Sequence, residues 1–312
     1  MHTRRHFNGL LLATLAAGGR CSFAAPASRM VGGVHLGLES YSLMPLRGED
    51  LQDRWIGLMH QLGFAECSVF EPLLQPVELT TKLQAARESK DRQAIDTTMQ
   101  ELNQWRAGLS VSSFRDMRSK FSAAGVRFAF FSGSTLSSSS TDADLEHVCA
   151  LTQALGAEFV TVAAGKSIVK RLVPLVARYD LRIGIQGRPN AHSTDPDAIA
   201  RAEDFEEAVG YSSRCAIDID IGDATGAGFD VMPFVTRNHA RIARIELKDR
   251  KRDNTSMPWG QGDTPLKDVL LYVRENRLPI RCYIDCDYAP ATQERIASIL
   301  NCRAYIHSVL GV

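Results

Sequence analysis

The chain has 312 residues, of which 45% are hydrophobic and 23% are charged. Its 36 Lys and Arg residues balance 36 Asp and Glu residues, so the formal net charge at pH 7 is zero. The hydrophobic content excludes a disordered chain, and the balanced charge argues against nucleic acid as a partner.

Residues 1–27 have the pattern of an export signal peptide. Arg4 and Arg5 precede an apolar run at residues 10–17, and small residues suited to cleavage follow at residues 22–27. The run is too short to span a bilayer, so we expect a twin-arginine signal, with an ordinary secretory signal as the alternative. The mature chain, residues 28–312, is then expected in the periplasm or outside the cell, without stable membrane association after signal removal.

Strand-like apolar runs alternate with helical patterns along the mature chain. The predicted strands are residues 34–40, 66–70, 126–131, 159–163, 181–186, 216–220, 242–247 and 280–285. Alternation of strands and helices predicts a parallel sheet, and eight such units in a chain of this size predict a single-domain α/β fold, the (β/α)8 TIM barrel. The long segment between the second and third strands, residues 79–124, is predicted to hold two helices with a break at residues 108–113.

Five of the predicted strands divide into an aliphatic and a polar set of alternate residues. In one of them, Ile217 and Ile219 alternate with Asp218 and Asp220. Alternate residues of a strand face opposite sides of a sheet, so the polar set is expected inside the barrel. A buried charge must be paired or must coordinate a ligand. The pattern therefore predicts a polar ligand site at the carboxyl ends of the strands.

Short motifs follow one another along the mature chain in a specific order. They are GLESYS at 37–42, QWR at 104–106 with FSAAGV at 121–126, DIGD at 220–223 with AGFD at 227–230, RI at 241–242 leading to ELKD at 246–249, and GQG at 260–262. In this order and spacing the sequence resembles the sugar phosphate isomerase/epimerase family of xylose-isomerase-like TIM barrels. The resemblance implies proton transfer at a carbon next to a carbonyl, assisted by a divalent metal.

In that family a Glu, an Asp, a His and a second Glu hold the metal at the ends of the fifth to eighth strands. The corresponding residues here are Gln186, Asp220, Glu246 and Asp285, and only Asp220 matches outright. A set of oxygen donors favours Mn, Mg or Ca over Zn. Basic residues of the same interior set could instead neutralise the carboxylates without any ion. An altered metal site and an internal network of ion pairs therefore both stay open.

Three residues are candidates for the chemistry itself. Glu246 or Asp285 is predicted to act as the base, and Lys248 as its electrostatic partner. Gln186 cannot accept a catalytic proton, so one member of the family's usual pair of carboxylates is missing.

Four further residues are candidates for contacts with the substrate. The interior set of the first strand includes Glu39, and Asp223 stands where the family often carries a His. Arg188 could bind a carboxylate or phosphate, or could form an internal ion pair. Trp259, in a loop between Pro258 and Gly260, could cover a sugar ring.

We therefore expect an exported enzyme of the sugar isomerase/epimerase class, acting on a small sugar, sugar acid or sugar-derived keto compound. The alternative is a carbohydrate- or acid-binding barrel that has lost the metal and the chemistry. A phosphodiester-cleaving enzyme is disfavoured by the neutral net charge and by the missing His ligands.

Overall fold

The computed structural model describes residues 29–312, apart from residues 45, 47, 49, 134–135 and 289–291. The expected export signal at residues 1–27 lies outside the described residues. No helix in the described part of the chain is both long enough and apolar enough to cross a membrane.

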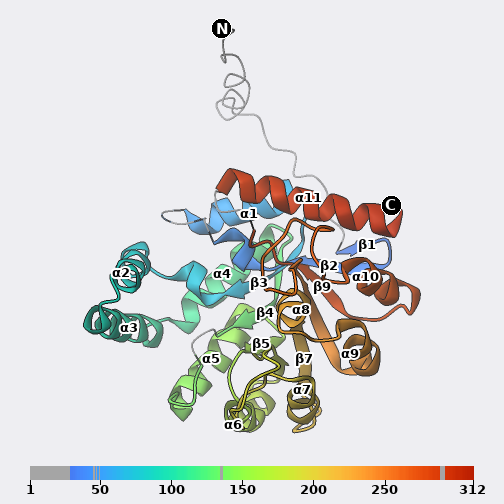
Figure 1. Cartoon of the computed structure of the whole chain (residues 1–312). Coiled ribbons are helices and arrows are strands. Elements are labelled where there is room, and N and C mark those ends of the chain that lie inside the picture. Colours follow the sequence, from blue (N-terminus) through green and yellow to red (C-terminus); the bar gives the residue numbers. More distant parts are fainter. Residues whose placement is uncertain (1–28, 45, 47, 49, 134–135, 289–291) are drawn as a thin grey trace, which may run out of the picture.

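Parallel strands close into a barrel with helices around it (Figure 1). Within the described ranges the barrel has eight strands, which are β2 (Val34–Leu38), β3 (Glu66–Phe70), β4 (Arg127–Ser132), β5 (Phe159–Val162), β6 (Arg182–Ile185), β7 (Cys215–Asp220), β8 (Ile242–Leu247) and β9 (Arg281–Ile284). Each strand pairs with the next, and β9 pairs with β2, where Leu36 lies opposite Cys282. The TIM barrel fold and all eight predicted strands are confirmed, with ends that shift by one or two residues.

One additional strand, β1 (Met30–Val31), pairs antiparallel with β2 outside the closed barrel. Gly32 and Gly33 form the two-residue loop between the strands, and both have positive φ angles, 54° and 87°. Such a loop matches the right-handed twist of the two strands, and glycine adopts its backbone angles without strain.

Helices connect the strands and surround the barrel. They are α1 (Leu51–Leu62), α2 (Val77–Glu88), α3 (Arg92–Ala107), α4 (Val111–Ala123), α5 (Asp142–Leu155), α6 (Lys166–Arg178), α7 (Ala202–Val209), α8 (Ile221–Gly226), α9 (Val231–Asn238), α10 (Leu266–Glu275) and α11 (Thr292–Leu310). Short 3-10 turns occur at Ser40–Leu43, Glu71–Leu74 and His239–Arg241.

The connection between β3 and β4 has three helices, where the sequence predicted two. The predicted break is present between α3 and α4, and Ser110 caps α4 by accepting a hydrogen bond from the Ser113 amide. A second break separates α2 from α3 because Lys90 adopts a left-handed conformation, with φ of 55°. Asp91 then caps α3 by accepting from the Ala94 amide. Helices α2 and α3 lie beside the barrel, away from the other helices (Figure 1).

The division into aliphatic and polar faces is confirmed. The outward residues Ile217 and Ile245 belong to the large hydrophobic core between barrel and helices. Inside the barrel, Tyr283 is fully buried, and a Cβ atom at Gly37 would overlap its ring. A glycine at residue 37 therefore leaves room for an aromatic ring across the barrel interior.

Glu66 is a buried carboxylate at the amino end of the barrel. Its Oε1 accepts a hydrogen bond from the Tyr283 hydroxyl at 2.7 Å and lies 3.0 Å from His35 Nε2, while Oε2 pairs with Arg127. Burial alone would raise the pKa of Glu66, but the contacts with His35, Tyr283 and Arg127 outweigh burial and lower it from 4.5 to about 2. The ionised form of Glu66 therefore stabilises the folded state.

Replacing Glu66 by Gln tests this contribution. A lowered pKa in the folded state gives stability that is fully present above pH 4.5 and is lost as the pH falls towards about 2. We expect E66Q to lower the free energy of unfolding by up to about 3 kcal/mol at neutral pH, and the difference from wild type to shrink below about pH 4.5. Urea unfolding followed by circular dichroism at a series of pH values measures this difference.

The matched control is Glu101→Gln, which removes a surface pair with Lys82. Loss of this exposed pair should cost at most about 1 kcal/mol. A difference between wild type and E66Q that does not change with pH would contradict the assignment of ionised Glu66 as the stabilising form.

Candidate functional site

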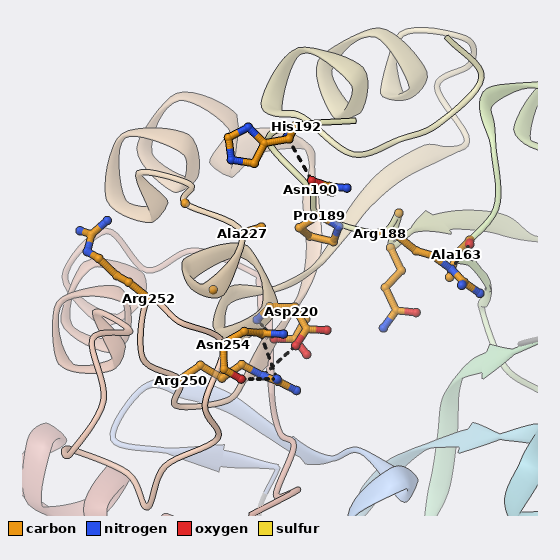
Figure 2. Close-up of a pocket in the computed structure, with 15 residues that line it drawn as sticks. Ala163, Arg188, Pro189, Asn190, His192, Asp220, Ala227, Arg250, Arg252 and Asn254 are labelled. Carbon is orange, nitrogen blue, oxygen red and sulfur yellow. Dashed lines mark hydrogen bonds and ion pairs between the residues drawn. The ribbon is translucent and has the colours of Figure 1, made fainter. Parts of the chain in front are cut away.

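A cavity of about 730 Å³ opens at the carboxyl ends of β5 to β8. Its polar lining residues are Gln186, Arg188, Asn190, His192, Asp220, Asp223, Arg250, Arg252 and Asn254 (Figure 2). The carboxyl ends of barrel strands are where TIM barrels place their active sites. The predicted location of the ligand site therefore coincides with this cavity.

The DIGD motif places two carboxylates at the cavity. Asp220 is the last residue of β7, and its side chain caps α8 by accepting a hydrogen bond from the Asp223 amide at 2.8 Å. The chain therefore passes directly from β7 into α8, and the side chains of Asp220 and Asp223 both line the cavity. Glu246 lies opposite Asp220 on the neighbouring strand β8.

Lys248 is surrounded by four carboxylates. Its Nζ atom lies 2.7 Å from Asp220 Oδ2 and 2.7 Å from Asp285 Oδ2. The carboxylates of Asp223 and Asp287 are 3.7 and 3.8 Å away. Burial alone would lower the pKa of Lys248, but these four negative charges raise it well above its ordinary value. Lys248 is therefore a permanent cation beside the cavity.

Arg244 is the second buried cation of the barrel interior. It forms a bidentate pair with Asp218, with both N–O distances 2.7 Å, and contacts Glu39 and Glu246 at 2.5 Å each. Its guanidinium also lies over the ring of Phe130, 4.4 Å from the centroid. The planar guanidinium can satisfy three carboxylates at once because its donors point in different directions in one plane.

Several carboxyl groups of the site have raised pKa values. Burial raises the pKa of Asp285 to about 7, against the opposing charge of Lys248. Burial and the nearby Asp220 raise the pKa of Asp223 to about 6, against Lys248 and Arg250. Burial also raises the pKa of Glu246, although the charge of Arg244 opposes this shift. Carboxyl groups that titrate near neutral pH are suited to proton transfer.

The structure divides the predicted site residues between the cavity wall and the layer behind it. Gln186, Arg188, Asp220 and Asp223 line the cavity. The other four predicted residues on the barrel strands or at their ends are buried: Glu39, Glu246, Lys248 and Asp285. Of these, Lys248 lies behind the cavity wall and pairs with Asp220, which lines the cavity.

Trp259, the remaining predicted site residue, lies outside the cavity lining. It is 9% exposed and packs edge to face on Tyr305 of α11, with ring centroids 5.9 Å apart. The loop is fixed in this position because Asp249 accepts hydrogen bonds from the amides of Gly260 and Gly262. Trp259 is therefore not among the residues that line the cavity, and its packing matches that of a core side chain.

Arg250 is a site residue that the sequence reasoning missed. Its guanidinium lies 2.9 Å from Asp223 and 2.8 Å from Asp287, so it links two of the carboxylates around Lys248. The available signal was the basic run at residues 248–252, which continues from the carboxyl end of β8 into the next loop.

The spacing of three carboxylates could by itself hold a metal ion. One oxygen of each of Asp220, Glu246 and Asp285 lies within 4.8 Å of the others. However, the Lys248 ammonium already lies 2.7 Å from both Asp220 and Asp285. The fourth expected ligand, Gln186, donates its amide N–H groups to both oxygens of Glu246, at 2.9 and 3.1 Å. In this arrangement the residues do not fit a divalent ion, because a cation of the chain occupies the space between its ligands.

Replacing Arg244 by Met tests the contribution of the buried guanidinium to stability. The variant keeps an unbranched side chain but leaves Asp218, Glu39 and Glu246 without their counter-ion. We expect R244M to lose about 3–5 kcal/mol in the free energy of unfolding, measured by urea unfolding at pH 7. Arg237→Met, which removes a pair with Glu206 and a side chain that is 58% exposed, should lose at most about 1 kcal/mol. Equal losses in the two variants would contradict the assignment.

Comparison with known proteins rests on the fold alone. Neither a protein-family model nor a curated protein sequence matches the chain. A sugar phosphate isomerase/epimerase from Parabacteroides distasonis is 12% identical, with a TM-score of 0.58, and the match covers 91% of this chain and 97% of that one.

Two further solved structures resemble the chain to the same degree. L-ribulose 3-epimerase is 11% identical, with a TM-score of 0.60 over 88% of this chain and 94% of that one. The IOLI protein, solved with a bound zinc atom, is 11% identical, with a TM-score of 0.58 over 88% of this chain and 98% of that one. The chain therefore has the TIM barrel fold of xylose-isomerase-like sugar isomerases and epimerases.

Proposed function

We propose that this protein is an enzyme of the sugar isomerase/epimerase class, which moves a proton next to a carbonyl in a sugar or sugar-derived keto compound. The observation that carries the proposal is the Lys248 ammonium, which is held by Asp220 and Asp285 directly behind the Asp220 side chain that lines a polar cavity. A fixed cation next to carboxylates is what the reaction requires, because negative charge develops on the carbonyl oxygen as the proton leaves carbon.

We place the base at Asp223. Its carboxylate lines the cavity, its side chain is 43% exposed, and it lies 3.7 Å from Lys248 Nζ. The bases expected from the sequence, Asp285 and Glu246, are at most 3% exposed and do not line the cavity. In this proposal Asp285 positions Lys248, and Glu246 helps to neutralise Arg244.

The reaction step conserves its atoms and charges. Asp223 takes the proton from the carbon next to the carbonyl, the C–H electron pair forms the new carbon–carbon double bond, and the carbonyl electron pair moves to oxygen. Lys248 stabilises the resulting enediolate oxygen. Return of the proton to the former carbonyl carbon, with transfer of the hydroxyl proton, gives the isomer.

Arg188 supports a substrate that carries an acidic group. It is exposed at the cavity wall, and its Nε donates to the Ala163 carbonyl at 3.2 Å. A guanidinium in this position can bind a carboxylate or phosphate. The export signal expected from the sequence would place the enzyme and its substrate in the periplasm or outside the cell. The donor set predicted a Mn, Mg or Ca ion, but Lys248 lies between two of the expected ligands, and no step of the proposed reaction depends on a metal.

Deuterium exchange tests the proposed reaction even when the product has not been identified. Sugars, sugar acids and their keto derivatives are incubated with the protein in D2O, and loss of the C–H signal next to the carbonyl is followed by proton NMR. We expect exchange with at least one compound, and a fall of about 100-fold or more in Asp223→Asn because the base is removed. Binding of that compound, measured by calorimetry, should persist in D223N.

The control is Glu203→Gln, which changes an exposed carboxylate outside this cavity and should exchange at the wild-type rate. Binding without exchange by the wild type would instead support a carbohydrate- or acid-binding barrel. That second candidate is favoured by the pairing of the buried acids with Lys248 and Arg244. Full exchange activity in D223N would move the base to another residue.

A further inference from the structure

The carboxylates at the metal position of this fold already hold a cation that belongs to the chain. The oxygens of Asp220, Glu246 and Asp285 that lie within 4.8 Å of one another form the same cluster into which Lys248 extends. Four carboxylates within 3.8 Å of one ammonium are more than a surface lysine gathers, and the Lys248 side chain is only 7% exposed. Burying the Lys248 ammonium removes its charge from water at a cost in free energy, and the four carboxylates offset that cost.

The stem of Lys248 is fixed by its neighbours. A Cβ atom at Gly222 would lie 2.8 Å from both the Cβ and the carbonyl oxygen of Lys248. The first turn of α8 therefore packs directly against the lysine, and only glycine allows this approach. Because both ends of the side chain are held, the ammonium has a defined position.

Two hydrogen-bonding positions at the cluster are left over. An ammonium has three N–H donors, and within the described residues Asp220 and Asp285 are the carboxylates at hydrogen-bond distance from Nζ. In the same part of the chain, the buried Asp285 Oδ1 has no hydrogen-bond partner. One donor and one acceptor are therefore unused in the buried cluster behind Asp220, whose own side chain lines the cavity.

We infer that the Lys248 ammonium takes the place of the divalent metal ion and makes this site independent of metal. The inference rests on the proposed function for the identity of the reaction, but its metal-binding part stands apart from any activity. Lys248 supplies one positive charge where a metal would supply two, and its free N–H donates to the oxygen on which charge develops. The reaction class is unchanged, and the electrophile is a residue of the chain.

Metal binding by the wild type and two Lys248 variants tests the inference. The protein is treated with EDTA, desalted and titrated with Mn²⁺, with bound ion measured by electron paramagnetic resonance and stabilisation measured by thermal unfolding. We expect no stoichiometric Mn²⁺ binding by the wild type. Lys248→Ala and Lys248→Met should gain affinity by about tenfold or more, because the vacated carboxylates can then coordinate the ion.

The matched control is Lys251→Ala, an exposed lysine on the following loop, which should bind Mn²⁺ no better than the wild type. Adding Asp285→Asn to K248A should remove the gained affinity. Because K248A and K248M leave several acids unpaired, circular dichroism establishes that at least one of them is folded.

Stoichiometric Mn²⁺ binding by the wild type overturns the inference, and this arm needs no variant. Failure of the folded variants to gain Mn²⁺ overturns it as well. Deuterium exchange by the EDTA-treated wild type, at an undiminished rate, is the expected result for the activity. Absence of exchange with every compound would count against the proposed function alone, because the Mn²⁺ titrations do not depend on a substrate.

Discussion

The structure depends on the neutralisation of charge inside a closed barrel. Arg244 is 1% exposed and contacts three carboxylates from β2, β7 and β8 or their ends. An unpaired charge at this depth would cost several kcal/mol, so the acids and the guanidinium require one another. Most TIM barrels fill this space with layers of branched aliphatic side chains. Here paired charged side chains occupy much of the barrel interior, from Arg244 to Asp220 at the cavity.

Strand β8 and the residue that follows it supply both cations and the acid between them. Arg244, Glu246 and Lys248 are alternate residues, so their side chains point to the same side and lie inside the barrel. Arg244 pairs with Asp218 deeper in the barrel, and Lys248 pairs with Asp220 and Asp285 at the carboxyl ends of the strands. Glu246 stands between the two cations and accepts from Gln186 on the cavity wall. The order of charges along one strand therefore connects the stability of the barrel with the chemistry proposed at its mouth.

Much of this arrangement could be predicted from the sequence because strands have a strict period of two. Ile217 and Ile219 alternating with Asp218 and Asp220 identify the strand, its inward face and the end of the barrel where its acids gather. Pairing could not be predicted in the same way, since a strand pattern does not say which acid meets which base. The Lys248 ammonium between Asp220 and Asp285 depends on the register of three strands.

Some local conformations and loop positions also could not be predicted from the sequence. Lys90 carries no side-chain signal for the left-handed conformation that separates α2 from α3. Trp259 reads as an exposed loop residue, but distant hydrogen bonds to Asp249 fix its loop against α11. Arg250 follows the last residues of β8, and its role appears only when β9 brings Asp287 beside it. The positions of Trp259 and Arg250 depend on contacts between segments far apart in the chain, whereas the break at Lys90 is local.

The origin of the cavity's acids has a stereochemical consequence. The carboxylates that line it, Asp220 and Asp223, both come from one short segment at the end of β7. A planar enediolate bound there would therefore meet carboxylates on a single face. Inversion of a carbon centre needs a proton donor on the face opposite to the base. A suprafacial proton shift between adjacent carbons needs only one acid–base group, on one face. Under the proposed function, this one-sided placement suits interconversion of an aldose with a ketose better than inversion at a stereocentre.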